Sequence, residues 1–185
     1  QYVSRADSRL HLVDVSTGKS TRIIGGTRKD TSYYGDVVFG ADEDTLLVTS
    51  DRDGEFVRLY RVTRKGKRWK WSALSADIPW DVEELAINED ASTLAFTVNE
   101  GGYAALYLVD LKTDVIKRVE SIPRGLIYGL RFARKAPVLG FTAAGPTRTG
   151  DAWTLNTTSG EVTQWTHSEI GGLDSANFRE PELIE

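Results

Sequence analysis

The sequence contains no cysteine and no methionine, and only two histidines. The absence of cysteine excludes disulfides, cysteine-based zinc sites and a thiol nucleophile. No run approaches the roughly 18 consecutive apolar residues that indicate a membrane span, and no secretory signal is visible at the N-terminus. Because the chain begins at Gln1 and lacks Met, we interpret it as an excised or processed portion of a longer protein.

Residues that could carry catalysis are also scarce. No G-x-S-x-G nucleophile elbow is present. His167 stands beside Ser168 and Glu169, but adjacent residues on a strand point to opposite faces and cannot form a catalytic relay. The net charge of −4 argues against non-specific nucleic-acid binding, which depends on neutralising phosphates. We therefore predict no catalytic residue, no metal site and no cofactor in this chain, and neither nucleic acid nor a membrane as a partner.

Two short motifs have simpler explanations than a binding site. Residues 51–54 (Asp-Arg-Asp-Gly) resemble the start of a calcium loop, but the twelfth position of such a loop is Val62, where a bidentate Glu is needed. The basic run 64–68 lies between two predicted strands. We expect an ordinary turn at the first motif and a solvated hairpin tip at the second.

What the sequence does contain is a repeat. A phrase with an apolar strand, a turn and a second apolar strand recurs at Leu46, Leu94 and Leu139, roughly every 46 residues. The aromatic residues Tyr60, Tyr107 and Trp153 follow the same spacing, and His11 precedes them at a similar distance. Periods of this length, with four short strands each, are typical of β-propeller blades. We therefore expect His11 to occupy a blade position and to have no catalytic role.

The fold class that follows is all-β: a partial β-propeller of about three complete four-stranded blades plus a half blade at the N-terminus. We predict blades at 26–75, 76–122 and 123–168, with the half blade at 1–25 and a linker at 169–185. The half blade should contain strands Leu10–Val15 and Thr21–Ile24. The complete blades should contain Asp36–Phe39, Thr45–Ser50, Val57–Val62 and Trp69–Ala73, then Glu84–Asn88, Thr93–Val98, Ala104–Leu111 and Ile116–Val119, then Ile127–Phe132, Val138–Ala143, Ala152–Asn156 and Val162–Thr166.

A closed propeller takes about 4–8 blades, so this number does not close a ring. The middle strands, such as Leu46–Val48, are apolar on both faces, as expected for a sheet packed between two neighbours. An open array would expose apolar faces at both ends. Partners that cover these faces are therefore predicted, either the missing blades of a parent chain or a second copy of this chain through self-association.

The meander also determines which loops lie together. Connections between the second and third strands of a blade share one end with connections between successive blades. These loops are longer and carry aromatic and arginine side chains, which are common on binding faces. We predict this end as the substrate-facing surface, with the candidate residues Arg52, Trp80, Arg124, Tyr128 and Arg148.

Some phrases resemble a known family. Residues 10–18 (LHLVDVSTG) match residues 106–114 (LYLVDLKTD), and the C-terminal part reads Trp165-Thr166-x-Ser168-Glu169 and later Pro181-Glu182-Leu183-Ile184. These phrases resemble the propeller domain of the prolyl oligopeptidase family of serine peptidases, in its acylaminoacyl-peptidase and dipeptidyl-peptidase branch. Pro181–Ile184 stands where that family leaves the last blade toward its hydrolase domain. Looser copies of the blade phrases also occur in TolB-like propellers.

The resemblance implies that this chain is the C-terminal half of a propeller and ends just before an α/β-hydrolase domain. In the family the propeller covers the active site and admits only short peptides. The implied function is gating and selection of short peptides, with the catalytic residues outside this chain. The alternative is a non-enzymatic TolB-like propeller that binds a protein partner. The compartment stays open between the bacterial cytoplasm and periplasm.

Overall fold

The computed structural model describes residues 1–27, 31–66 and 68–182, so Lys67, Leu183 and Ile184 lie outside the described part. The chain divides into two compact units, residues 1–83 and 84–185, and we describe each by itself. Among the described residues the only helical element is a short 3-10 turn, Ser175–Asn177 (η1). The all-β prediction is confirmed.

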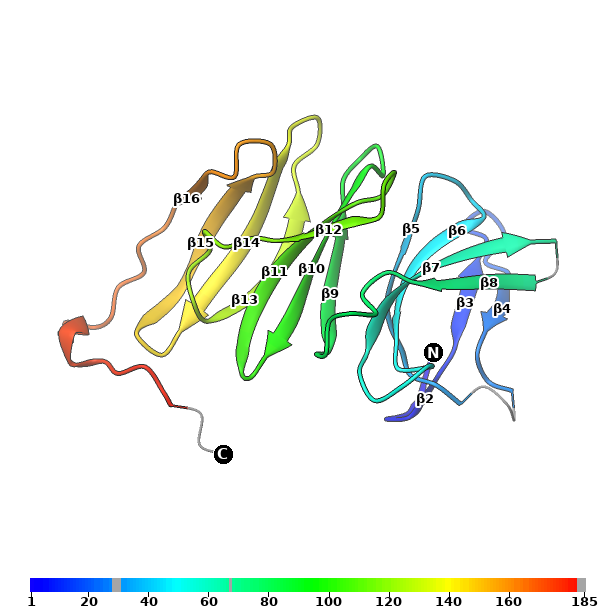
Figure 1. Ribbon diagram of the computed structural model, residues 1–185, viewed down its shortest axis with the longest axis horizontal. Coiled ribbons are helices and arrows are strands. Elements are labelled where there is room, and N and C mark those ends of the chain that lie inside the picture. Colours follow the sequence, from blue (N-terminus) through cyan, green and yellow to red (C-terminus); the bar gives the residue numbers. More distant parts are fainter. Residues whose placement is uncertain (28–30, 67, 183–185) are drawn as a thin grey trace. The chain divides into compact units, whose positions relative to one another are not determined.

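The first unit contains one complete four-stranded sheet and a partial one (Figure 1). The complete sheet has the order β5-β6-β7-β8, and all its strands pair antiparallel with their sequence neighbours. Its strands are β5 (Tyr34–Phe39), β6 (Thr45–Ser50), β7 (Arg58–Lys65) and β8 (Arg68–Ala73). The partial sheet contains the predicted pair as β3 (Leu10–Val13) and β4 (Ser20–Ile24).

The N-terminal part has two strands that the sequence did not indicate, β1 (Tyr2–Ser4) and β2 (Asp7–Ser8), which pair with each other. The pairing extends one step further, because the Arg9 amide donates to the Gln1 carbonyl at 2.9 Å. These two strands form a two-stranded sheet separate from that of β3 and β4.

The second unit contains two complete sheets, with the orders β12-β11-β10-β9 and β13-β14-β15-β16 (Figure 1). The three sequence-ordered sheets of the chain confirm the predicted partial propeller of three four-stranded blades. The blade limits given above stay a prediction. The strands are β9 (Val82–Ile87), β10 (Thr93–Glu100), β11 (Tyr103–Asp110), β12 (Val115–Arg118), β13 (Leu126–Phe132), β14 (Val138–Gly145), β15 (Arg148–Asn156) and β16 (Val162–Gln164).

The aromatic repeat reflects a common register. Tyr60 pairs with Val48, Tyr107 with Phe96, and Trp153 with Phe141. Each of these partners lies two residues beyond one of the repeated leucines, and Leu46, Leu94 and Leu139 are all buried. Because side chains alternate along a strand, each leucine and the partner two residues later point to the same face. The sequence period is thus the period of the sheets.

The recurring Asp-x-x-Thr phrase forms a turn between the third and fourth strands. A carboxylate oxygen of Asp14 accepts the Ser16 and Thr17 amides at 2.9 and 3.0 Å, and Asp110 accepts the Lys112 and Thr113 amides at 2.8 and 3.1 Å. Side-chain and backbone hydrogen bonds from Ser16 and Thr17 lower the pKa of Asp14 to about 2. The short acidic side chain satisfies turn amides that the strands leave unpaired.

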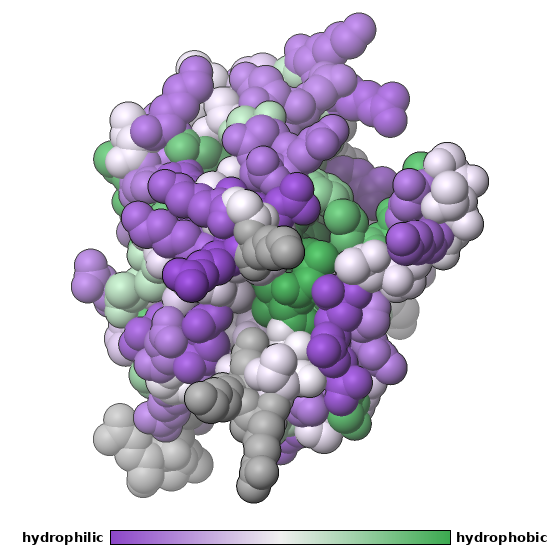
Figure 2. Space-filling view, turned by 90° about the vertical axis from the view of Figure 1, so that its right-hand side faces the viewer, coloured by the Kyte–Doolittle hydropathy of each residue, from purple (hydrophilic) through white to green (hydrophobic). Residues whose placement is uncertain are grey.

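Large apolar side chains stay exposed on strands of both units. In the first unit these include Val37 and Phe39 on β5, and Figure 2 shows an apolar area among polar side chains on one side of this unit. In the second unit, Leu126 and Tyr128 on β13 and Trp165 after β16 are about half exposed or more. Contiguous exposed apolar patches often mark interaction sites, whereas single exposed apolar residues are common on any protein surface.

Candidate functional site

Three connections of the second unit meet at one end of its sheets. They are the β10–β11 turn at Gly101 and Gly102, the β14–β15 turn at Pro146 and Thr147, and the connection that enters β13. The Ala104 amide donates to the Gly125 carbonyl at 2.8 Å, which ties the first connection to the third. A Cβ at Gly145 would lie 3.4 Å from the Arg124 carbonyl oxygen and 3.6 Å from Arg148 Cγ. The Arg124 backbone and the Arg148 side chain therefore both lie beside Gly145.

Arg124 is held by an aromatic ring. Its guanidinium carbon lies 3.8 Å from the centroid of the Tyr103 ring. Such a cation–π contact fixes the guanidinium while leaving its N–H donors directed outward. No carboxylate lies within ion-pair distance of Arg124 among residues 1–27, 31–66 and 68–182. The Arg124 guanidinium can therefore receive an anionic group.

Tyr128 lies within β13 (Leu126–Phe132), in agreement with the predicted strand Ile127–Phe132, and not in the loop to which the predicted substrate-facing surface assigned it. Its hydroxyl oxygen is 3.2 Å from the place where a Cβ at Gly150 would stand, so its ring extends over the sheet toward β15. Arg148 is the first residue of β15 and pairs with Gly145. A bulge follows Tyr128 in β13, where the pairing with β14 shifts register between Tyr128 and Arg131.

That bulge is held by a carboxylate from the neighbouring sheet. Glu84 Oε2 accepts the Gly129 amide and Oε1 accepts the Leu130 amide, both at 2.9 Å. Gly129 has φ of 70°, a conformation that suits glycine. We call this contact the Glu84 clasp. It links β9 to β13 within the second unit, and no sequence pattern indicates it.

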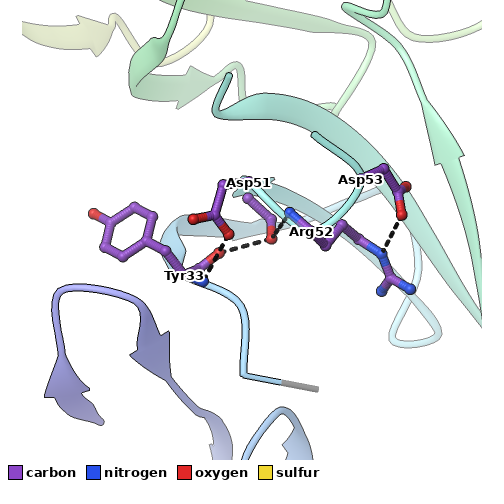
Figure 3. A network of polar contacts seen from close by, with 5 residues as sticks. Tyr33, Asp51, Arg52 and Asp53 are labelled. Atoms are coloured by element: carbon purple, nitrogen blue, oxygen red, sulfur yellow. Dashed lines mark hydrogen bonds and ion pairs between the residues drawn. The ribbon is translucent and has the colours of Figure 1, made fainter. Parts of the chain in front are cut away.

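Arg52 and Trp80 belong to the first unit, whereas Arg124, Tyr128 and Arg148 belong to the second. Arg52 is engaged locally: its Nε lies 3.4 Å from Asp53 Oδ1 and its guanidinium carbon 3.9 Å from the Trp71 ring. Figure 3 shows the ion pair and the adjoining contact of the Tyr33 amide with Asp51, at 2.8 Å. Trp80 is 40% exposed.

The segment after β16 is anchored in two places, and we call residues 169–182 the exit segment. Before it begins, Thr166 Oγ1 and the Ser168 amide each donate to Asp151 Oδ1 at 2.8 Å. Burial raises the pKa of Asp151, but the hydrogen bonds from Thr166 and Ser168 outweigh burial and the pKa is lowered overall. Thr166 and Ser168 lie two residues apart and thus on one side of an extended chain, which explains the Trp-Thr-x-Ser phrase.

Further along, the exit segment returns to the loop end. Thr147 Oγ1 donates to Glu180 Oε1 at 3.0 Å, and the Tyr103 hydroxyl lies 3.2 Å from the Pro181 carbonyl oxygen. In Figure 1 this segment is the orange and red part that follows β16. The sequence motif at Pro181 predicted where the chain leaves the last blade, but it did not indicate these contacts with Tyr103 and Thr147.

A polar cluster lies beside Tyr103. The Tyr107 hydroxyl donates to Glu100 Oε1 at 2.6 Å, and Arg118 binds Glu100 Oε2 at 3.0 Å and also pairs with Glu120. Arg118 thus holds both carboxylates that border a cavity of about 360 Å³ next to Arg124. The charged side chains of this cluster are paired with one another. Arg124, which also borders the cavity, has no ion pair with them.

We expect Tyr107 to make the stability of the protein depend on pH in the alkaline range. Desolvation, followed by the hydrogen bond and charge of Glu100, raises the pKa of Tyr107 from 10.0 to about 12. A raised pKa stabilises the fold fully below pH 10, and this contribution is lost as the pH rises toward 12. Urea midpoints measured from pH 8 to 12 should fall less steeply for Tyr107→Phe than for the wild type. Equal slopes for the two proteins would contradict this assignment.

Within the described part of the chain, no cluster of three or more His, Asp or Glu side chains could hold a metal ion. Nor does any described helix have the length and apolar character needed to cross a membrane.

Consecutive antiparallel four-stranded sheets define a partial β-propeller. No protein-family model and no curated protein matches the sequence. Among solved structures, a prolyl endopeptidase matches 92% of this chain with a TM-score of 0.71 and 13% identity, and puromycin hydrolase matches 89% with 0.69 and 17%. TolB from Acinetobacter baumannii matches 84% with a TM-score of 0.66 and 13% identity.

At these identities the similarity shows the fold. The match covers 24% of each of the two peptidase chains and 37% of TolB, so this chain spans a quarter to somewhat over a third of these proteins. The propeller resemblance stated from the sequence is confirmed at the level of fold.

Proposed function

We propose that the chain is the propeller portion of a prolyl-oligopeptidase-like serine peptidase and that it gates and selects short peptide substrates. The catalytic α/β-hydrolase domain lies outside this chain, as do the missing blades. The fold similarity to a prolyl endopeptidase and puromycin hydrolase supports this proposal.

One observation carries the proposal further: the exit segment contacts the same loop end that presents Arg124 and Arg148. A domain that follows the exit segment would begin at this end. Arg124 and Arg148 would then face the space between the propeller and the hydrolase domain. A peptide must cross that space to reach a covered active site.

Gating would operate by exclusion together with anchoring. A narrow passage above a buried site admits short, unfolded chains and rejects folded proteins. Arg124, fixed on Tyr103, can bind a carboxylate through two parallel N–H donors. We assign it the role of anchoring the C-terminal carboxylate of the substrate, while Tyr128 and Arg148 form the adjoining wall.

Replacing Arg124 with alanine in the parent protein should raise KM for peptides with a free C-terminal carboxylate about tenfold, the loss of roughly 1.4 kcal/mol of binding. The same peptides with an amidated C-terminus should show little change, because they offer no carboxylate. The measurement is a comparison of kcat and KM for both peptide forms. Arg134→Ala is the matched control, since Arg134 is exposed in the β13–β14 turn at the other end of the sheet.

An equal rise in KM for free and amidated peptides would refute the anchoring role. A parent gene that continues past Glu185 without encoding a G-x-S-x-G hydrolase domain would refute the peptidase proposal as a whole.

The alternative is a non-enzymatic propeller that binds a protein partner, and the similarity to TolB, with a TM-score of 0.66, favours it. Cleavage of chromogenic short peptides by the intact parent, lost on substitution of its nucleophilic serine, would exclude this alternative. Self-association of two chains is a further way to cover the exposed apolar faces. Light scattering that gives a monomer mass would exclude it.

A further inference from the structure

A cavity of about 490 Å³ lies in the second unit where the glycine turns meet the exit segment. One side is formed by Gly101, Gly102 and Tyr103, and another by residues 125–126 and 144–146. Pro181 and Glu182 close a third side. We call it the glycine cavity. Its volume lies within the range of about 300–1,000 Å³ that is typical of ligand sites.

The lining is apolar and sterically open. Leu126, Ala144 and Pro146 contribute aliphatic surface, and the glycines contribute backbone without side chains. A Cβ added at Gly102 would meet no atom within 4 Å, so the turn leaves room at this wall. An apolar group that enters such a site loses contact with water and gains packing, which favours binding.

The exit segment shows how this wall holds an extended peptide. The Tyr103 hydroxyl can donate to the Pro181 carbonyl oxygen at 3.2 Å or to Glu180 Oε2 at 3.4 Å. Thr147 binds the other carboxylate oxygen of Glu180. The contacts use one backbone carbonyl and one side chain. A hydroxyl of this wall thus binds a backbone carbonyl of the exit segment, while the apolar lining beside it stays available.

The charged residues around the glycine cavity restrict the charge of the ligand that it can bind. Glu182 borders the cavity and Glu180 lies on the adjoining wall, so two carboxylates stand at one side. Arg124 contacts the Tyr103 ring but does not border the cavity. Neither Arg124 nor Arg148 lines the cavity, so the bordering carboxylates weigh against an anionic ligand inside it. An uncharged apolar group suits the site.

We propose that the glycine cavity binds an uncharged apolar side chain of a peptide, with the exit segment as one wall of the site. Because the exit segment forms that wall, a bound ligand should stabilise its position. The inference goes beyond the proposed peptidase, since binding can be measured on this chain alone and does not require a hydrolase domain.

The test uses the full 185-residue chain with two probes, N-acetylleucinamide and the anionic N-acetylleucine. Amide chemical shifts of Gly101, Gly102, Gly125 and Gly145 are followed by NMR as the probe is added. We expect saturable shifts at these glycines for the amide, with a Kd on the order of 1 mM, and binding of the anionic probe about tenfold weaker. Shifts that do not saturate, or that leave these glycines unaffected, would refute the proposal.

Two variants of the same sheet sharpen the test. Ala144→Ile fills the cavity and should abolish binding of N-acetylleucinamide. Ala152→Ile places the same side chain on the neighbouring strand away from the cavity, and should bind as the wild type does. If Ala144→Ile binds the probe as tightly as the wild type, the cavity is not the site.

A second measurement reports on the exit segment and does not depend on Ala144→Ile being folded. Trypsin cuts after Arg179, and saturating N-acetylleucinamide should slow this cleavage severalfold. Tyr103→Phe removes the hydroxyl that holds Pro181, so it should speed the cleavage and weaken the probe. Cleavage that the probe does not change in the wild type would show that the exit segment is no part of the site.

Discussion

Glu84→Ala is expected to lower the free energy of unfolding by about 3 kcal/mol, the combined loss of two hydrogen bonds to a charged group. Glu84 accepts the Gly129 and Leu130 amides at 2.9 Å each, and Leu130 is buried. Without the carboxylate, the Leu130 amide has to find water or stay unpaired, which is costly in a buried site. Urea denaturation, followed by tryptophan fluorescence, measures the change.

Two further variants separate this contact from general effects on β9. Glu84→Gln keeps the length of the side chain but has one carbonyl oxygen, so it should lose about half of the stabilisation. Glu83→Ala changes the exposed neighbouring residue and should stay within about 0.5 kcal/mol of the wild type. A loss below 1 kcal/mol for Glu84→Ala would mean that the bulge in β13 is held by other contacts.

The strands and their register were predictable because they follow from a local, repeated pattern. The leucines at 46, 94 and 139 each occupy the second position of the second strand in a sheet, as the sequence repeat indicated. The Asp14 and Asp110 phrases were also informative, since an acidic residue before a turn binds amides only two and three residues away. Such contacts need no knowledge of the rest of the fold.

The contacts that build the site were not predictable in this way. The Glu84 clasp joins residues that are 45 and 46 positions apart, and the partners are backbone amides, which every residue has. Similarly, Arg52 and Arg124 look alike in the sequence. In the structure Arg52 is paired with Asp53 and stacked on Trp71, while the Arg124 guanidinium stacks on the Tyr103 ring and has no ion pair among the described residues. Only the tertiary arrangement distinguishes an arginine that is paired with a carboxylate of the chain from one that can bind a ligand.

Gly125→Ala should destabilise the protein by about 4 kcal/mol, the sum of backbone strain and steric overlap. Gly125 has φ of 148°, where L-residues are strained, and a Cβ there would stand 2.1 Å from the Ala144 carbonyl oxygen. The overlap is with backbone, which cannot rotate away as a side chain can. Relief requires a movement of the β13–β14 edge, which would also weaken the hydrogen bond from the Ala104 amide to the Gly125 carbonyl.

Gly102→Ala is the control that separates the two causes. Gly102 also has a positive φ, of 89°, but a Cβ there meets no atom within 4 Å. It should therefore cost only the strain of a left-handed residue, about 1 kcal/mol. Comparable losses for the two variants in urea denaturation would mean that the β13–β14 edge yields easily. A much larger loss at Gly125 would show that this edge is rigid, and a rigid edge is what holds Arg124 and the glycine cavity in place.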